Sequence, residues 1–251
     1  MKKKIYSKFN KNKIALLPIV EFPGEIVVVD KAEDTADAVA DLLKSDILGI
    51  DTETRPIFKK GTSHKVALLQ VSNHTKCYLF RLNLTDITDA IKKLLENTRI
   101  PMVGLSLHDD ILALHRRADF VPGRFFELQN IVGDIGIEDL SLQKVYANLF
   151  GLKISKRQRL SNWEAATLTD KQQIYAATDA WTCINIFEEV CRLKVSQDYE
   201  LIKVPDPKLQ AAPTEQTTAD KSETEELKAD DATVEKSPRP TEVNSPNEAK
   251  A

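Results

Sequence analysis

The sequence ILGIDTET, residues 47–54, places an apolar run directly before two acids. Four apolar or small residues are typical of a buried strand, and they lead into Asp51 and Glu53. Side chains two residues apart on a strand point to the same side, so both carboxylates are directed at one place. Two negative charges this close oppose each other's ionisation unless a cation lies between them. Strands that end in solvent often carry acids too, so the pair needs support from the rest of the chain.

Strands and helices alternate on both sides of these acids. Apolar and β-branched runs predict strands at Glu25–Asp30, Ile47–Thr52, Lys65–Ser72, Lys76–Phe80, Met102–Gly104 and Phe125–Leu128. Helical periodicity predicts helices at Asp34–Leu43, Ile87–Asn97, His108–Arg117, Leu142–Leu149 and Asp170–Leu193. Hairpin strands followed by alternating strands and helices indicate an α/β fold, with a mixed β-sheet flanked by α-helices.

Several polar residues have a local structural explanation. Thr169, with Gln172 three residues later, predicts a capping box at the start of the last helix. Thr85 or Asp86 is the predicted cap of the helix that begins near residue 87. Gln70 interrupts an otherwise apolar strand, and we expect backbone groups to hydrogen-bond its amide.

The composition limits the class of protein. The 251 residues carry a net charge of −3, so any contact with nucleic acid must come from local basic patches. Three cysteines exclude a disulfide framework, and no apolar run approaches the roughly 18 residues of a membrane helix. The N-terminal residues 1–24 lack a small-x-small cleavage site and are interpreted as a lead-in to the domain. We therefore expect a cytoplasmic protein without membrane contact.

The C-terminal part differs in character from the rest of the chain. Residues 205–251 hold 11 acidic and 6 basic residues, six prolines and no aromatic residue or glycine. So little apolar surface does not offset the entropy lost on ordering, and we expect a disordered polar tail. The predicted organisation is a lead-in at 1–24, a domain at 25–195, a connecting segment at 196–204 and this tail.

Further acids lie on other predicted elements. Asp109 and Asp110 begin a predicted helix, where acids are also common for electrostatic reasons. Tyr175 and Asp179 are four residues apart on the last helix, so they share one face. Oxygen ligands from separate elements are what Mg²⁺ or Mn²⁺ requires, and the four histidines show no spacing typical of a zinc site.

Three motifs together resemble a known family. They are IDTET at 50–54, VGLSLHDDILAL at 103–114 and LSNWEAATLTDKQQIYAATDAW at 160–181. In order and spacing they are similar to the motifs of the DEDDy branch of 3′–5′ exonucleases, the group that includes RNase D and the Werner syndrome exonuclease. The resemblance covers about residues 25–195 and implies a ribonuclease H-like mixed sheet.

The resemblance also implies a chemistry for the five matching residues. Asp51, Glu53, Asp110 and Asp179 would hold two Mg²⁺ or Mn²⁺ ions, and Tyr175 would orient the attacking water. The register of the second motif selects Asp110 rather than its neighbour Asp109. The implied reaction is hydrolysis at the 3′ end of DNA or RNA, with release of nucleoside 5′-monophosphates.

A basic cluster precedes the third motif. We predict contact with the nucleic-acid backbone by Lys153, Lys156, Arg157 and Arg159. A solvated run of charges explains the cluster equally well. The alternative to an enzyme is a catalytically silent nucleic-acid-binding module of the same fold. A third interpretation is an interaction protein in which the tail at 205–251 is the working part, and the sequence leaves protein partners unknown.

Overall fold

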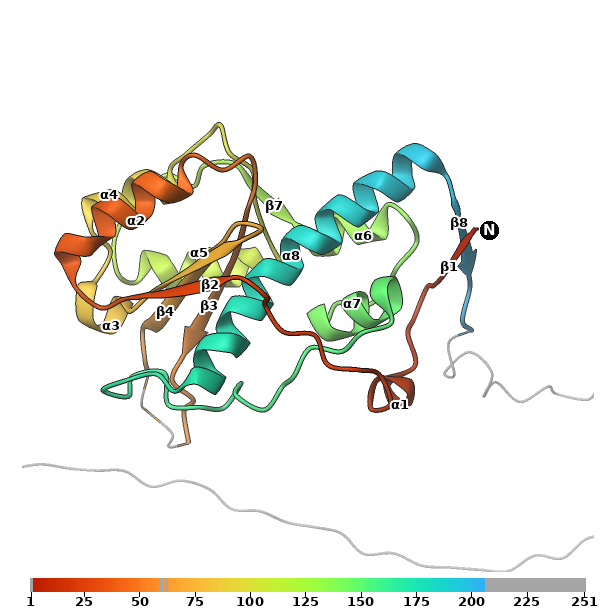
Figure 1. Cartoon of the computed structure of the whole chain (residues 1–251), viewed down its shortest axis with the longest axis horizontal. Coiled ribbons are helices and arrows are strands. Elements are labelled where there is room, and N and C mark those ends of the chain that lie inside the picture. The colour runs from red at the N-terminus through yellow and green to blue at the C-terminus, as the bar shows by residue number, and fades with distance from the viewer. Residues whose placement is uncertain (1, 59–60, 62, 206–251) are drawn as a thin grey trace, which may run out of the picture. The chain divides into compact units, whose positions relative to one another are not determined.

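A six-stranded mixed sheet forms the centre of the computed structural model, which describes residues 2–58, 61 and 63–205 (Figure 1). The strands lie in the order β2-β5-β4-β3-β6-β7. Their bounds are β2 Glu25–Val29, β3 Leu48–Thr54, β4 Val66–Ser72, β5 Lys76–Phe80, β6 Met102–Gly104 and β7 Phe125–Glu127. β4 is antiparallel to both of its neighbours, whereas the other pairs are parallel. The predicted α/β fold is confirmed, and the predicted tail lies, apart from Pro205, outside the described residues.

Strand β3 is longer than the apolar run predicts. The sequence predicts an end at Thr52, whereas the strand extends to Thr54, so Glu53 lies on it together with Asp51. Antiparallel pairing with β4 places Asp51 opposite Gln70. Because side chains of directly opposed residues share a face, this register fixes which polar group lies beside the acid.

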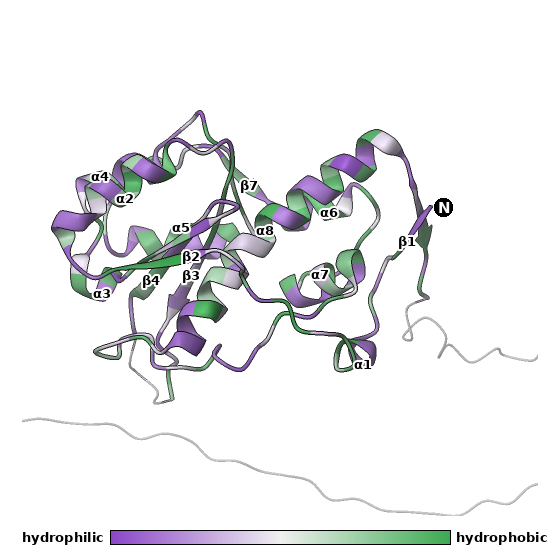
Figure 2. Cartoon of the chain, viewed as in Figure 1, coloured by the Kyte–Doolittle hydropathy of each residue, from purple (hydrophilic) through white to green (hydrophobic). Residues whose placement is uncertain are grey.

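Helices cover both faces of the sheet (Figure 1). The helices are α2 Thr35–Leu42, α4 Asp89–Leu95, α5 Leu107–His115, α7 Leu142–Phe150 and α8 Asp170–Ser196. Leu42, Leu94 and Leu114 of α2, α4 and α5 share one core cluster with Ile50 of β3. On the other face, α8 contacts β3, β4, β5 and β6. Figure 2 shows apolar residues along β2 and β4 and polar ones on part of β3, while the helices carry both kinds.

Helix α8 approaches β3 very closely at Gly49. A Cβ atom at this position would lie 1.9 Å from the carbonyl oxygen of Ala180, far inside van der Waals contact. Glycine is therefore required for the close approach of the two backbones. Since Ala180 follows Asp179, the contact brings that aspartate next to the strand that carries Asp51.

The observed helix caps can be compared with those predicted from the sequence. The capping box of Thr169 and Gln172 is confirmed. The cap predicted at Thr85 or Asp86 is wrong, because α4 begins later and the Thr88 side chain accepts from the Ile91 N–H. Three short helices were not predicted from the sequence: α1 Lys11–Ile14, α3 Leu82–Thr85 and α6 Leu128–Gly133.

Two short strands at the ends of the described chain form a second sheet. β1, Lys3–Tyr6, pairs in parallel with β8, Tyr199–Ile202. The predicted lead-in and connecting segment thus contain regular structure that joins them to each other. Among the described residues, no helix combines the length and the apolar character needed to cross a bilayer.

Candidate active site

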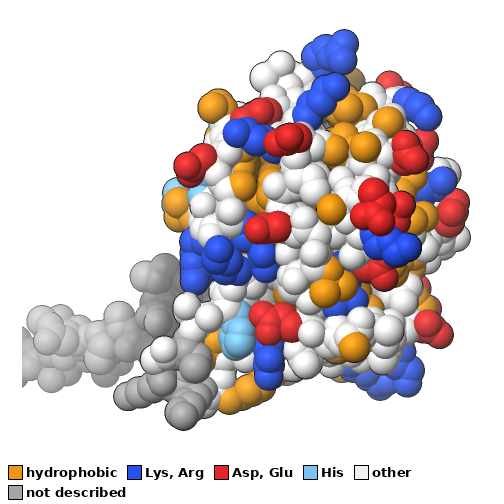
Figure 3. All heavy atoms as spheres, turned by 90° about the vertical axis from the view of Figure 1, so that its left-hand side faces the viewer, with side chains coloured by type: hydrophobic (Ala, Val, Ile, Leu, Met, Phe, Trp, Pro, Cys, Tyr) orange, Lys and Arg blue, Asp and Glu red, His pale blue; other side chains and the backbone are white. Residues whose placement is uncertain are grey.

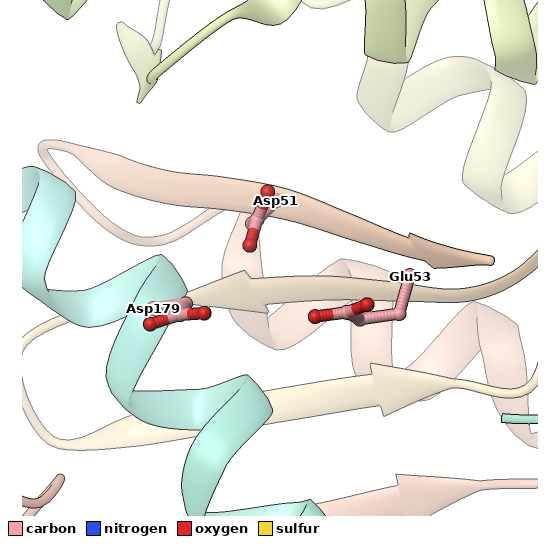
Figure 4. Close-up of side chains that lie close together, drawn as sticks. All are labelled: Asp51, Glu53 and Asp179. Carbon is pink, nitrogen blue, oxygen red and sulfur yellow. The ribbon is translucent and has the colours of Figure 1, made fainter. Parts of the chain in front are cut away.

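Three carboxylates from two elements converge between β3 and α8. Oxygen atoms of Asp51, Glu53 and Asp179 all lie within 4.8 Å of one another. Figure 4 shows Asp51 and Glu53 on the strand and Asp179 on the helix, with their carboxylates turned toward a common space. The i, i+2 spacing on β3 and the close contact at Gly49 together produce this arrangement.

Burial raises the pKa values of all three acids, and repulsion from neighbouring acids adds to the shift at Asp51 and Glu53. Burial is the largest cause in each case: it raises the pKa of Glu53 to about 9 and that of Asp179 to about 7. The pKa of Asp51 is raised well above its ordinary range by burial and by the charges of Asp110, Asp179 and Glu53. The protein alone thus leaves the gathered negative charges largely uncompensated, as expected where a cation binds.

The second motif places Asp110 beside this group. Its carboxylate accepts a hydrogen bond from the Thr52 hydroxyl on β3. Burial raises the pKa of Asp110 to about 6, and its charge in turn raises the pKa of Asp51 and of Glu53. Asp109, by contrast, is exposed. The structure therefore brings Asp110, rather than Asp109, toward the acids of β3.

Two residues that the sequence analysis did not single out position helix α5. The carboxylate of Glu127 accepts from the N–H groups of Ser106 and Leu107, at 3.0 and 2.7 Å. These bonds satisfy free N–H groups at the start of the helix that carries Asp110. Thr52 holds the same aspartate from the sheet side. In the sequence, the only indication of the Thr52–Asp110 hydrogen bond was the position of Thr52 between the acids Asp51 and Glu53.

Tyr175 lies next to Asp179 and is 8% exposed. Its hydroxyl hydrogen-bonds the Asp179 carboxylate, and burial is the main cause that raises its pKa far above the ordinary range. The fully buried Trp163 supports the ring, with the ring centroids 6.0 Å apart. Arg81 holds the loop that contains Trp163, because its guanidinium donates to the carbonyl of Ala165.

The four predicted basic residues separate into different surroundings. Lys156 and Arg159 line a cavity of about 160 Å³ together with Tyr175 and Asp179. Arg159 also lowers the pKa of Glu53. Lys153 instead donates to the carbonyl of Ala15. Arg157 lines a second cavity, together with Ile19 and Val20, which Tyr175 also borders. Figure 3 shows basic groups among acidic ones on one face, in keeping with a chain of nearly balanced charge.

The expectation that backbone groups bond the Gln70 amide is wrong. Gln70 is fully buried, and neither its Oε1 nor its Nε2 atom has a hydrogen-bonding partner among the described residues. A strand satisfies its own backbone groups through the sheet, so these groups are not free to bond a buried side chain.

The fold and the site together define the class of the protein. The fold is that of the ribonuclease H-like exonucleases. A family model described as "3'-5' exonuclease" matches residues 26–192, about two thirds of the chain. The chain belongs to the DEDDy-type 3′–5′ exonuclease family, as the sequence motifs predict.

Relatives share parts of this chain to different extents. The mouse protein "Bifunctional 3'-5' exonuclease/ATP-dependent helicase WRN" is 33% identical over 187 residues, which cover 70% of this chain and 13% of that protein. The Aedes aegypti Nibbler EXO domain superposes with a TM-score of 0.63 at 17% identity, covering 70% of this chain and 91% of that one. RNase D of Trypanosoma brucei, in complex with RNA U12, gives a TM-score of 0.59 at 19% identity, with coverages of 67% and 63%.

Proposed function

We propose that this chain hydrolyses phosphodiester bonds at the 3′ end of DNA or RNA and releases nucleoside 5′-monophosphates. One observation carries the proposal: carboxylates from β3 and α8 lie within 4.8 Å of one another, beside the hydroxyl of Tyr175. Family membership supplies the 3′–5′ direction. The T. brucei RNase D in complex with RNA, which shares the fold, supports a nucleic-acid substrate.

The donor set fits two divalent cations of the Mg²⁺ or Mn²⁺ type. Asp51, Glu53 and Asp179 offer carboxylate oxygens close enough for shared ligation, and Asp110 lies beside them. The raised pKa values of Asp51 and Glu53 fit the same interpretation, because added positive charge would relieve the repulsion from neighbouring acids. When bound, such ions lower the pKa of the attacking water and stabilise the departing 3′ oxygen.

The other residues position the substrate and the water. Because the pKa of Tyr175 is raised, its side chain stays a hydroxyl at neutral pH and acts by hydrogen bonding rather than as a base. The hydroxyl aligns the water for in-line attack on the terminal phosphate. Lys156 and Arg159, which line the cavity beside Asp179, bind the phosphate backbone.

An end-labelling assay tests the proposal. Oligonucleotides of DNA and of RNA, labelled at the 3′ or the 5′ end, are incubated with Mg²⁺, with Mn²⁺ or with EDTA. We expect a 3′ label to be released at once as a mononucleotide and a 5′ label to remain on a shortening strand. EDTA should stop the hydrolysis of both DNA and RNA.

Two acid-to-amide variants supply matched controls for this assay. Asp51→Asn removes a member of the cluster and should abolish hydrolysis, whereas Asp109→Asn changes an exposed neighbour and should leave the rate unchanged. Strand binding by the wild type without cleavage, in every metal condition, would reject the enzyme and favour the catalytically silent binding module.

A further inference from the structure

One buried polar side chain beside the acids has no partner. Gln70 is 0% exposed, and both polar atoms of its amide lack a hydrogen bond among the described residues. Burying an amide without such a bond is costly, and the great majority of buried polar groups in proteins are satisfied. The side chain therefore needs an explanation beyond the packing of the sheet.

The register of the sheet directs this amide toward Asp51. Gln70 on β4 lies directly opposite Asp51 on β3, so both side chains are on the same face of the sheet. That face is covered by α8, because Gly49, two residues before Asp51, meets the backbone of Ala180. The amide thus lies in the layer between sheet and helix that also holds the acid.

The other neighbours of Gln70 within the sheet offer no comparable group. Its cross-strand neighbour on the other side is Leu79 of β5, which is apolar and fully buried. Ser72, two residues further along β4 on the same face, already donates its hydroxyl to the carbonyl of Asn73. Of the two side chains directly opposite Gln70, only that of Asp51 accepts a hydrogen bond.

We propose that Gln70 is a positioning residue for Asp51, to whose ionised carboxylate its amide N–H donates directly or through one buried water. The inference rests on the proposed function, in which Asp51 holds divalent cations. A hydrogen bond to an ionised acceptor is stronger than one to a neutral acceptor. A neutral amide orients the carboxylate without adding a positive charge that would compete with the cations.

The test compares two variants on the same strand. Gln70→Met keeps the length of the side chain and removes the amide, while Ser72→Ala removes a hydroxyl that bonds elsewhere. Binding of Mn²⁺ alone to the full chain is measured by electron paramagnetic resonance. We expect Q70M to bind Mn²⁺ about 10- to 100-fold more weakly than the wild type. S72A should stay within about twofold, because its hydroxyl lies outside the proposed network.

A second measurement separates this role from a structural one. In EDTA, Q70M should melt at about the same temperature as the wild type, because the methionine side chain has a similar length and fills the same buried space. Lower metal affinity without lower stability is the expected pair of results. Should Q70M not fold, Gln70→Leu is judged by the same criteria.

The outcomes distinguish this inference from the proposed function. Mn²⁺ affinity of Q70M within about twofold of the wild type overturns the role of Gln70 and leaves the exonuclease intact. Equal losses in Q70M and S72A also overturn it, since they indicate general loosening of the strand. A wild-type chain that neither binds Mn²⁺ nor hydrolyses nucleic acid removes the proposed function itself, and the role of Gln70 with it.

Discussion

Two carboxylates on helix α8, Asp179 and Glu189, lie in opposite electrostatic surroundings. Asp179 packs against the sheet beside two further acids, and burial is the first cause that raises its pKa to about 7. Glu189, further along the helix, accepts two hydrogen bonds from Arg192 at 2.7 and 2.9 Å and pairs with Lys3. The bonds from Arg192 are the main cause that lowers the pKa of Glu189.

The difference separates a chemical role from a structural one within a single helix. An acid that folding places next to other acids reduces the free energy of unfolding, and such groups concentrate at functional sites. An acid whose charge is matched by neighbouring cations costs little and serves to hold elements together. We therefore propose a chemical role for Asp179 and a role for Glu189 in the attachment of β1.

Amide substitution of the two acids should separate them by the largest effect. We expect Asp179→Asn to lower the rate of 3′-end hydrolysis by at least about 10³-fold, since it removes a charged cation ligand. Glu189→Gln should retain a rate within about twofold of the wild type. Both rates are measured on one 5′-labelled strand at saturating Mn²⁺. A comparable loss of hydrolysis rate in E189Q would contradict the separation of a chemical role for Asp179 from a structural role for Glu189.

The stability of the same variants should depend on pH in opposite directions. The folded pKa of Asp179, about 7, exceeds its ordinary value of 3.8, so the unfolded chain releases its proton first as the pH rises. In EDTA, the wild type therefore loses stability between about pH 4 and pH 7, and Asp179→Asn loses less, because the raised pKa values of Asp51, Glu53 and Asp110 still act while that of Asp179 no longer does.

Thermal unfolding in EDTA measures this difference. At pH 8 we expect D179N to be more stable than the wild type by about 2 kcal/mol, or roughly 6 °C in melting temperature. The advantage should vanish near pH 3, where the acid is protonated in both states. An advantage that is independent of pH would point to packing rather than charge.

Two lysines of the basic cluster extend the comparison to the substrate. Lys156 lines the cavity beside Asp179, whereas Lys153 is bonded to the carbonyl of Ala15. We expect Lys156→Gln to weaken binding of a labelled single strand about 10-fold in EDTA and to reduce the salt slope by about 1. Lys153→Gln should leave binding within about twofold. Equal effects of the two substitutions would mean that the basic cluster attracts the strand through its total positive charge rather than through a contact made by Lys156.

Much of the fold follows from local pattern, and the misses have a physical cause. The apolar run before Asp51 and the capping box at Thr169 each identify an element without knowledge of its neighbours. β1 and β8 are four residues long and pair across almost the whole described chain, Lys3 with Tyr199. Neither strand has a periodicity that reveals a partner so distant in sequence.

The site divides in the same way. Residues two or four apart on regular elements share a face, which pairs Asp51 with Glu53 and Tyr175 with Asp179. Asp110 is selected only by the resemblance to the exonuclease motifs. Spacing does not separate Lys153 from Lys156, since that depends on where the N-terminal segment lies. Nor does it show that the Gln70 amide lacks a partner, which is a property of the closed layer between sheet and helix.

The smallest expected effect concerns Glu189 and the strand it holds. Because the folded pKa of Glu189 is lowered, its contribution to stability is present above its ordinary value of 4.5 and is lost as the pH falls. We expect Glu189→Gln to cost about 0.5 kcal/mol at pH 7 in low salt, and less in high salt, where partly exposed ion pairs are screened. Lys3 belongs to β1, so the loss should be local: amide hydrogen exchange should quicken in β1 and β8 and stay unchanged in β3. If exchange in β3 quickened as well, Glu189 would support the active site too, and the two ends of α8 would not act independently.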